Sequence, residues 1–263
     1  MSNIFSQQLI LSLISGVFIS GIAGYLGTLM LSKKMSIVAG PLAHLSFPGV
    51  AIAIIFGFNI YLGVFPFVLI GAFLIWLLEE KTKLPVENLA AIIFAAGIGT
   101  AFLFLPIDQA EAALVGSIGT ITLLETIIVI IISLLIFLVI KVLYKRMMLI
   151  NVDEDLATIE GVNVKKYNLI YLLSIATVVA LGVYLVGGLI TAALIAIPAA
   201  SSKNISNTMQ AYKVWAVIFG IISTIAGIVI ANYFKLPIGP MVIIVEVVVF
   251  LVSIIYRSLV QYK

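Results

Sequence analysis

The sequence predicts an all-α, polytopic integral membrane protein. The chain is 63% hydrophobic and only 10% charged, whereas about a quarter of the residues of a typical soluble domain are charged. Apolar runs that can cross the hydrocarbon layer, which takes about 20 residues, recur along the whole length. The longest polar stretch runs from Lys145 to Lys166 and is too short for a soluble domain. Residues 1–263 are therefore expected to form a single transmembrane domain.

The apolar runs predict eight to nine transmembrane helices, with nine preferred. The opening segment MSNIFSQQ lacks the basic start of a signal peptide, and the run after it is too long for one, so the first helix is expected to be retained. The seventh run is short and is expected to end at Pro198, which would make it a half-span or a re-entrant element. The expected helices cover residues 7–31, 36–57, 60–78, 86–105, 121–143, 167–185, 187–200, 212–232 and 238–256.

The basic residues predict how the chain is oriented. With nine spans and the N-terminus outside, all of the 14 Lys and Arg residues except Lys235 fall in the loops after spans 1, 3, 5 and 7 or in the C-terminal tail. Loops rich in Lys and Arg stay on the cytoplasmic side of a membrane. We therefore expect these loops and the C-terminus to be cytoplasmic. A net charge of +3 is too weak to indicate a nucleic-acid partner, and none is expected.

One small residue stands at every fourth position of the first expected helix. In lipid, a ridge of small side chains lets a second helix approach closely. We expect this ridge to be a packing surface, and its members are Ser12, Gly16, Ser20, Gly24 and Thr28.

The chain lacks the motifs of several common enzyme classes. It has no GxxxxGK[ST] phosphate loop, no HExxH motif and no GxSxG elbow. It has no cysteine, which excludes disulfides and thiolate metal sites, and a histidine-based triad would have to use His44, its single histidine. We therefore expect neither enzymatic activity nor a tightly bound cofactor.

The polar segment from Ile150 to Asn168 predicts a short helix between spans 5 and 6. Asp153, Glu154 and Asp155 precede a short amphipathic stretch, and acidic side chains are favourable at the start of a helix. Gly161 then suits a C-terminal cap. This pattern fits either a solvated connector or a docking helix for a cytoplasmic partner.

Two later segments contain unusual backbone residues. Small residues fill GGLITAALIAIPAASSK (187–203), and Pro198 interrupts it. That composition fits tight packing or a mobile element beside a pathway, because proline leaves a backbone carbonyl without its helical partner. In FKLPIGPMVII, Pro237, Gly239 and Pro240 predict a fixed turn between the last two spans.

Four stretches of the chain together point to a family. In order they are MSIVAGPLAHLSFPGVA (35–51), DEDLATIEGV (153–162), GGLITAALIAIPAA (187–200) and LPIGP (236–240). Each motif alone is modest, but the order and spacing of all four are specific. The chain resembles the permease subunit of the zinc/manganese/iron ABC importer family over essentially its full length.

The resemblance implies the rest of a transport complex. Two permease copies, as a homodimer, would form a pathway for a divalent metal ion in a prokaryotic cytoplasmic (inner) membrane. An extracytoplasmic metal-binding protein would deliver the ion, and a separate cytoplasmic ATPase would use ATP. That ATPase would dock on the short loop helix, at Asp153, Glu154, Asp155, Ala157 and Gly161.

His44 is the candidate metal contact, and it lies between helix-breaking residues. Pro41 precedes it, and Pro48 and Gly49 follow it. In the family an Asp often stands four residues before this histidine, whereas here that position is Gly40. One imidazole leaves most of a zinc shell unfilled, but a pathway does not need a tight site. We expect His44 to line the cation path or its gate, and the alternative is a buried histidine bonded to a backbone carbonyl.

The acidic residues in or near the spans carry weaker expectations. Glu246 lies midway along the last span, where a charge is costly, so we expect an interhelical hydrogen bond or, second, a cation or proton contact. Glu125 lies near the outer end of span 5 and can reach interfacial water. Asp108 and Glu111, in the outer loop after span 4, are expected to be solvated, with attraction of cations or contact with the delivery protein as the alternative.

Two other functions remain open at this stage. An ion-coupled secondary transporter would use Glu246 and His44 without an ATPase, and a membrane scaffold would not transport at all. The loop helix favours the ATPase-driven importer, because a secondary transporter needs no docking helix. The residues do not select the metal, since zinc, manganese and iron(II) all accept imidazole and oxygen ligands, and the missing acid at position 40 also leaves cobalt open.

Overall fold

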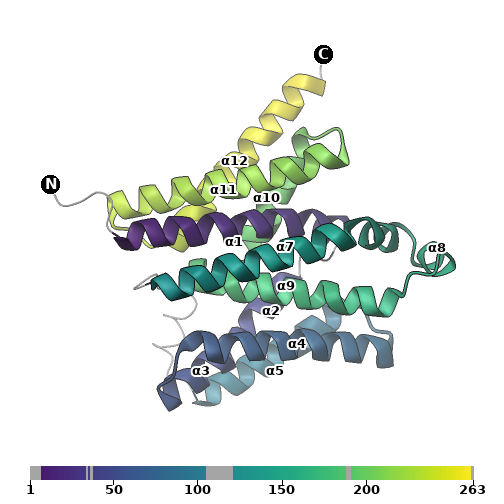
Figure 1. Cartoon of the computed structure of the whole chain (residues 1–263), viewed down its shortest axis with the longest axis horizontal. Coiled ribbons are helices and arrows are strands. Elements are labelled where there is room, and N and C mark those ends of the chain that lie inside the picture. Colours follow the sequence, from purple (N-terminus) through teal and green to yellow (C-terminus); the bar gives the residue numbers. More distant parts are fainter. Residues whose placement is uncertain (1–6, 34, 36–37, 105–120, 188–190, 262–263) are drawn as a thin grey trace.

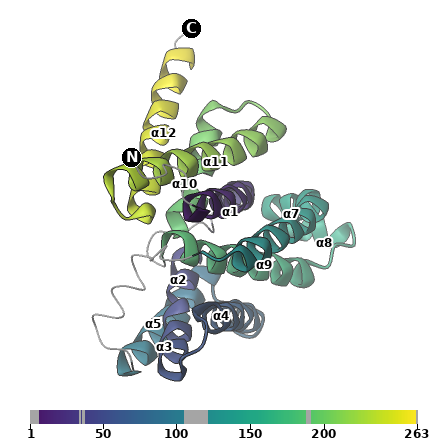
Figure 2. The same cartoon turned by 60° about the vertical axis from the view of Figure 1, so that its left-hand side comes forward.

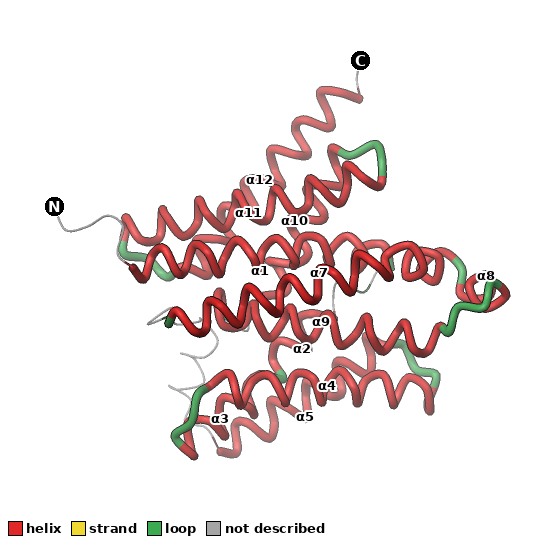
Figure 3. Tube along the Cα trace, in the orientation of Figure 1, coloured by secondary structure: helices red, strands yellow, loops and turns green. Residues whose placement is uncertain are grey.

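A computed structural model describes residues 7–33, 35, 38–104, 121–187 and 191–261 (Figure 1). The described part of the chain is helical, with short connecting loops (Figure 3). Each of the nine expected runs contains a helix in the part of the chain that is described, and the second run contains two. Their bounds, together with the loop helix, are α1 (Gln7–Ser32), α2 (Ala39–His44), α3 (Ser46–Phe56), α4 (Ile60–Thr82), α5 (Val86–Phe104), α7 (Leu123–Val152), α8 (Glu154–Ile159), α9 (Val164–Val186), α10 (Thr191–Ile205), α11 (Met209–Phe234) and α12 (Ile238–Gln261).

Seven helical segments are long and apolar enough to cross a membrane, counted over the residues that the structure describes. The segment Ala39–Phe56 counts as one of them although it contains a break. The apolar part of α5 and the whole of α10 are shorter. At 1.5 Å per residue, the 15 residues of α10 extend about 22 Å, which is less than the roughly 30 Å of a hydrocarbon layer.

Contrary to the expectation from the sequence, prolines do not mark the ends of these helices. The second expected span breaks at Leu45, between α2 and α3, and not at a proline. Pro41 and Pro48 each occupy the third position of a helix, where the missing N–H has no intrahelical partner to lose. Pro198 lies inside α10, which continues to Ile205. The expectation that the seventh helix ends at Pro198 is therefore wrong.

The helices form three groups that lie side by side (Figures 1 and 2). The middle group contains α1, α7 and α9. Helices α10, α11 and α12 lie on one side of it, and α2, α3, α4 and α5 lie on the other. The short helix α8 projects at one end of the bundle, which we call the α8 end.

The small-residue ridge of α1 packs as predicted. Its five residues, from Ser12 to Thr28, are all buried. A Cβ placed on Gly24 would overlap the backbone carbonyl of Ala216 in α11, and one placed on Gly27 would overlap the carbonyl of Ile195 in α10. Glycine therefore lets α1 contact the backbones of two neighbouring helices directly.

Candidate functional site

The loop helix α8 is capped at both ends, as the sequence predicted. Asp153 is the N-cap, and its side chain accepts a hydrogen bond from the backbone N–H of Leu156 at 2.9 Å. At the other end Gly161 has φ +78°, which favours glycine. The N–H groups of Gly161 and Val162 donate to the carbonyls of Thr158 and Ala157, at 3.0 and 2.9 Å. These paired bonds fix where the helix ends.

The exposed surface of α8 includes large apolar side chains beside its acidic residues. Ile159 is 82% exposed and Leu156 is 44% exposed, and Val152 just before the helix is 77% exposed. Ala157, which the resemblance assigned to ATPase docking, is fully buried and packs inward instead. Leu156 and Ile159 were not predicted as site residues, although their i, i+3 spacing in a polar loop indicates that both lie on one face of a helix.

Lys33 anchors α8 to the bundle. It follows α1, and its ammonium donates to Oδ1 of Asn168 in α9 at 2.7 Å and lies 4.0 Å from a Glu154 carboxylate oxygen in α8. Burial lowers the pKa of Lys33, and the Glu154 carboxylate opposes that shift. The loop helix is thus linked through one half-buried cation to two helices of the middle group.

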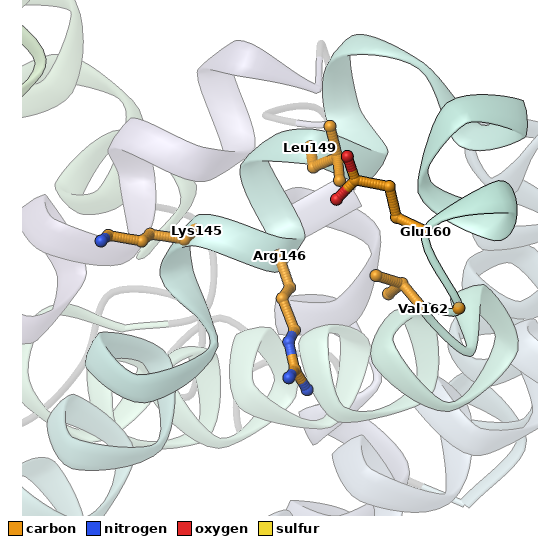
Figure 4. Close-up of a pocket in the computed structure, with 6 residues that line it drawn as sticks. Lys145, Arg146, Leu149, Glu160 and Val162 are labelled. Carbon is orange, nitrogen blue, oxygen red and sulfur yellow. The ribbon is translucent and has the colours of Figure 1, made fainter.

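A cleft of about 320 Å³ lies where α7 meets the turn after α8 (Figure 4). Figure 4 shows the Glu160 carboxylate beside Leu149, whereas the Arg146 guanidinium extends away from it. The guanidinium donates instead to the Tyr167 hydroxyl at 2.5 Å. The cleft contains both basic and acidic side chains and lies next to the exposed apolar residues of α8. Its lining residues are Lys145, Arg146, Leu149, Glu160, Gly161 and Val162.

His44 ends α2 at the break. Its Nδ1 lies 2.8 Å from the carbonyl oxygen of Gly40. Because a carbonyl can only accept, Nδ1 carries the proton, and in a neutral ring Nε2 is then free to accept a hydrogen bond or bind a cation. The hydrogen bond to the Gly40 carbonyl is the bond that the alternative interpretation expected. Because this bond uses Nδ1, it also leaves Nε2 available as a ligand atom.

The surroundings of His44 are partly open. Gly40, Pro41 and His44 are half-buried, whereas the rest of α2 is buried. The imidazole contacts the edge of Phe94 in α5, with ring centroids 4.9 Å apart, and Phe47 at 5.6 Å. Among the described residues no three His, Cys, Asp or Glu side chains come together as a metal site. One protomer therefore offers a single imidazole here.

Pro48 and Gly49 act in packing. Both are buried, and a Cβ on Gly49 would overlap the backbone carbonyl of Gly63 in α4. The side chain of Leu45, at the break, is held between glycines of two neighbouring helices, and a Cβ on Gly97 would lie 2.7 Å from its Cδ2. These contacts fix the orientation of α2 and of His44.

The acidic residues differ in their contacts. Glu246 is 1% exposed, and neither carboxylate oxygen has a hydrogen-bond partner among the described residues, so its expected interhelical hydrogen bond is absent there. Glu125 forms a capping box with Thr122 at the start of α7, and its carboxylate accepts from Asn59 at 3.4 Å. Asp108 and Glu111 lie outside the described residues.

Comparison with known proteins connects this chain to membrane transport. The family model described as the ABC 3 transport family matches residues 6–257. Among curated relatives, the high-affinity zinc uptake system membrane protein ZnuB of Haemophilus influenzae is 28% identical over 94% of this chain and 97% of its own length. The manganese transport system membrane protein MntC of Listeria monocytogenes is 25% identical over 93% of this chain and 89% of its own length.

A solved structure has the same fold. PsaBC from Streptococcus pneumoniae, in complex with Fab, superimposes with a TM-score of 0.79. The superposition covers 94% of this chain and 91% of that chain, at 22% sequence identity. The arrangement of helices in Figure 1 is therefore shared across nearly the whole length of both chains.

Proposed function

The chain belongs to the ABC 3 transport family, and from that premise we propose that it is the membrane permease of an ATP-driven importer for zinc or manganese. The observation that carries the proposal is the near full-length match to zinc and manganese membrane proteins. Iron(II), which binds similar ligands, is the third candidate. The chain is a transport subunit, and ATP hydrolysis belongs to a partner.

The α8 end is the docking surface for that ATPase. Two exposed apolar side chains, Leu156 and Ile159, project from a helix whose ends are fixed by caps. Apolar side chains in the centre of an interface with a polar rim are typical binding hot spots. The adjacent cleft at Arg146 and Glu160 supplies that rim. In this assignment the α8 end faces the cytoplasm and the other end receives ions from an extracytoplasmic binding protein.

The cation path passes His44, and a second copy of the chain completes it. The half-buried face of α2 adjoins α5 through the contact of His44 with Phe94. Beyond that contact, α5 exposes small residues at every fourth position, Ala91, Ala95 and Gly99, a pattern that allows close helix packing in lipid. Pairing two copies over this face would bring two imidazoles towards one axis. Two neutral imidazoles and water give a weak site from which an ion can leave.

Reconstitution with the partner ATPase tests the transport function. Zinc, manganese, iron(II) and cobalt should be tested in turn, and we expect uptake into vesicles with zinc or manganese that stops when the ATPase is inactivated. Uptake by the purified permease alone would instead identify a secondary transporter. No ion movement in either arrangement would contradict a transport role.

Two substitutions separate the possible roles of His44. An Asn side chain places its amide nitrogen near the position of Nδ1 and can keep the bond to Gly40, but it has no counterpart of Nε2. We therefore expect His44→Asn and His44→Ala to lose uptake alike, and His44→Asn to keep the wild-type melting temperature. Normal uptake by His44→Asn would mean that the histidine only holds α2 in place.

A further inference from the structure

Among the described residues, five buried polar atoms on α11 and α12 have no hydrogen-bond partner. One is the Tyr212 hydroxyl near the start of α11, and the other four lie farther along the two helices. These four are both carboxylate oxygens of Glu246 in α12 and the hydroxyl oxygens of Ser223 and Thr224 in α11. The three residues are 0–1% exposed. A buried polar group without a hydrogen bond is unfavourable, and a buried charge is more so, so this concentration of polar atoms needs a physical reason.

The helix register places the carboxyl and the hydroxyls at the same depth. A short turn joins α11 to α12, so the two helices run antiparallel (Figure 1). A Cβ on Gly227 would lie 2.5 Å from Cα of Val242, which makes these residues direct neighbours. Four residues, or about 6 Å, away from that contact, α11 presents Ser223 and α12 presents Glu246. Both helices bury the faces that carry these residues.

Helix α10 reaches the same depth. Its Asn204 donates to Ser253 of α12 at 3.0 Å. About two turns earlier in both helices, Pro198 and Glu246 lie at a common level, and a Cβ on Gly220 of α11 would lie 3.7 Å from Cγ of Pro198. Because Pro198 has no N–H, the carbonyl of Leu194 loses its helical partner. The buried carboxyl, the hydroxyls and the proline break therefore occupy one stretch of the α10–α11–α12 contact.

The charge of Glu246 limits what can occupy this position. The sequence has no acidic residue after Glu160 other than Glu246, so a divalent ion would leave a net positive charge in an apolar surrounding. A water molecule can satisfy the hydroxyls but cannot balance a carboxylate. The other ionisable side chains described on α9 to α12 are basic or phenolic, lie away from this level and supply no counter-charge: Lys165, Lys166, Tyr167, Tyr171, Lys203, Tyr212, Lys213, Tyr233, Tyr256 and Arg257.

We propose that Glu246, Ser223 and Thr224 form a buried site for one monovalent cation, either a proton or Na⁺, within each protomer. A single positive charge neutralises the carboxylate, and the hydroxyls complete an oxygen-only shell. The site is distinct from the His44 path, because α12 and α2 lie on opposite sides of the middle group (Figure 2). It goes beyond the proposed metal transport and does not depend on it.

Labelling with a hydrophobic carbodiimide tests the occupant. The reagent adds to a protonated carboxyl buried in the membrane and not to a carboxylate that holds Na⁺. The permease with its ATPase, in lipid nanodiscs, is labelled from acidic to alkaline pH in either choline or sodium chloride, and Glu246 is quantified by mass spectrometry. We expect strong labelling in acidic choline that falls severalfold as pH rises. If Na⁺ is the occupant, sodium suppresses labelling where choline does not.

Matched variants identify the ligands. Ser223→Ala is expected to shift the pH midpoint or weaken the protection by sodium. Ser253→Ala, on the same buried face of α12 but with partners in Asn204 and the Phe250 carbonyl, should leave both unchanged. Equal labelling at every pH in both salts, absence of labelling in acidic choline, or identical effects of the two serine variants would each overturn the proposal.

Discussion

The loop helix α8 and the contact between α11 and α12 depart from their surroundings in opposite ways. In α8 the polar ends are capped by hydrogen bonds, while Leu156 and Ile159 face water. Where α11 packs on α12, Glu246 and Ser223 are buried and have no hydrogen-bond partner among the described residues. This difference indicates two kinds of functional site. Apolar atoms exposed to water indicate a protein partner, and polar atoms buried in the membrane indicate an ion.

The largest effect is expected from closing the space between α11 and α12. Gly227→Val would force a side chain against the backbone of Val242, and overpacking of this kind costs about 3 kcal/mol. We expect loss of folded protein in detergent, measured by size-exclusion chromatography. Val229→Leu, at an exposed position of the same helix, is the control, and equal yields of the two variants would contradict the close packing.

A charge placed at Ile159, on the exposed surface of α8, should prevent the proposed binding of the ATPase. Ile159→Asp places a carboxylate where we propose that the ATPase binds, and loss of one hot-spot contact costs about 2 kcal/mol or more in binding. We expect uptake to fall at least about tenfold and the ATPase to stop co-purifying, while the melting temperature of the permease alone is unchanged. Thr158→Ala, also exposed, should retain both. Co-purification of the ATPase with Ile159→Asp at the wild-type level would remove α8 from the interface.

A smaller effect is expected from the N-cap. Asp153→Ala removes the hydrogen bond to the Leu156 N–H, at a cost of about 1 kcal/mol in helix stability. Because α8 is short, we expect partial unwinding and a several-fold fall in ATPase affinity. Asp153→Asn keeps an equivalent cap and should bind as the wild type does. Equal loss in both variants would show that the charge and not the cap is required.

The smallest effect concerns Lys33, the half-buried lysine beside α8. Burial lowers the pKa of folded Lys33 below its usual value, so between the lowered pKa and 10.5 the unfolded chain binds more protons and the free energy of unfolding rises with pH. Lys33→Met should lose this rise. Melting temperatures in detergent from neutral to alkaline pH measure it, and parallel profiles for the variant and the wild type would contradict the assignment.

Helix positions follow from the sequence because an apolar run of membrane length has few alternatives to a helix. The ends are less predictable, and α7 extends to Val152 rather than residue 143, because hydropathy marks the membrane and not the end of the helix. The break at Leu45 was not predictable, since the neighbouring glycines that hold this leucine come from α4 and α5.

The candidate sites were predictable to different degrees. The caps of α8 at Asp153 and Gly161 are local, so sequence alone located them. The burial of Ala157 depends on how α8 packs on α7, and no local pattern reveals it. The partnerless state of Glu246 depends on side chains of other helices, and for this reason the sequence predicted a hydrogen bond that the described structure lacks.

The glycines of α1 determine which parts can move in a transport cycle. Gly24 and Gly27 bring the backbones of α11 and α10 against α1 with no side chains between them, and such surfaces cannot slide without opening voids. These three helices should travel as a rigid block. The contact between α4 and α9 is linked instead by polar groups: Lys165 pairs with Glu80, and the backbone carbonyl of Lys165 accepts a hydrogen bond from the Trp76 indole at 3.1 Å. Such polar links can break and re-form with neighbouring groups.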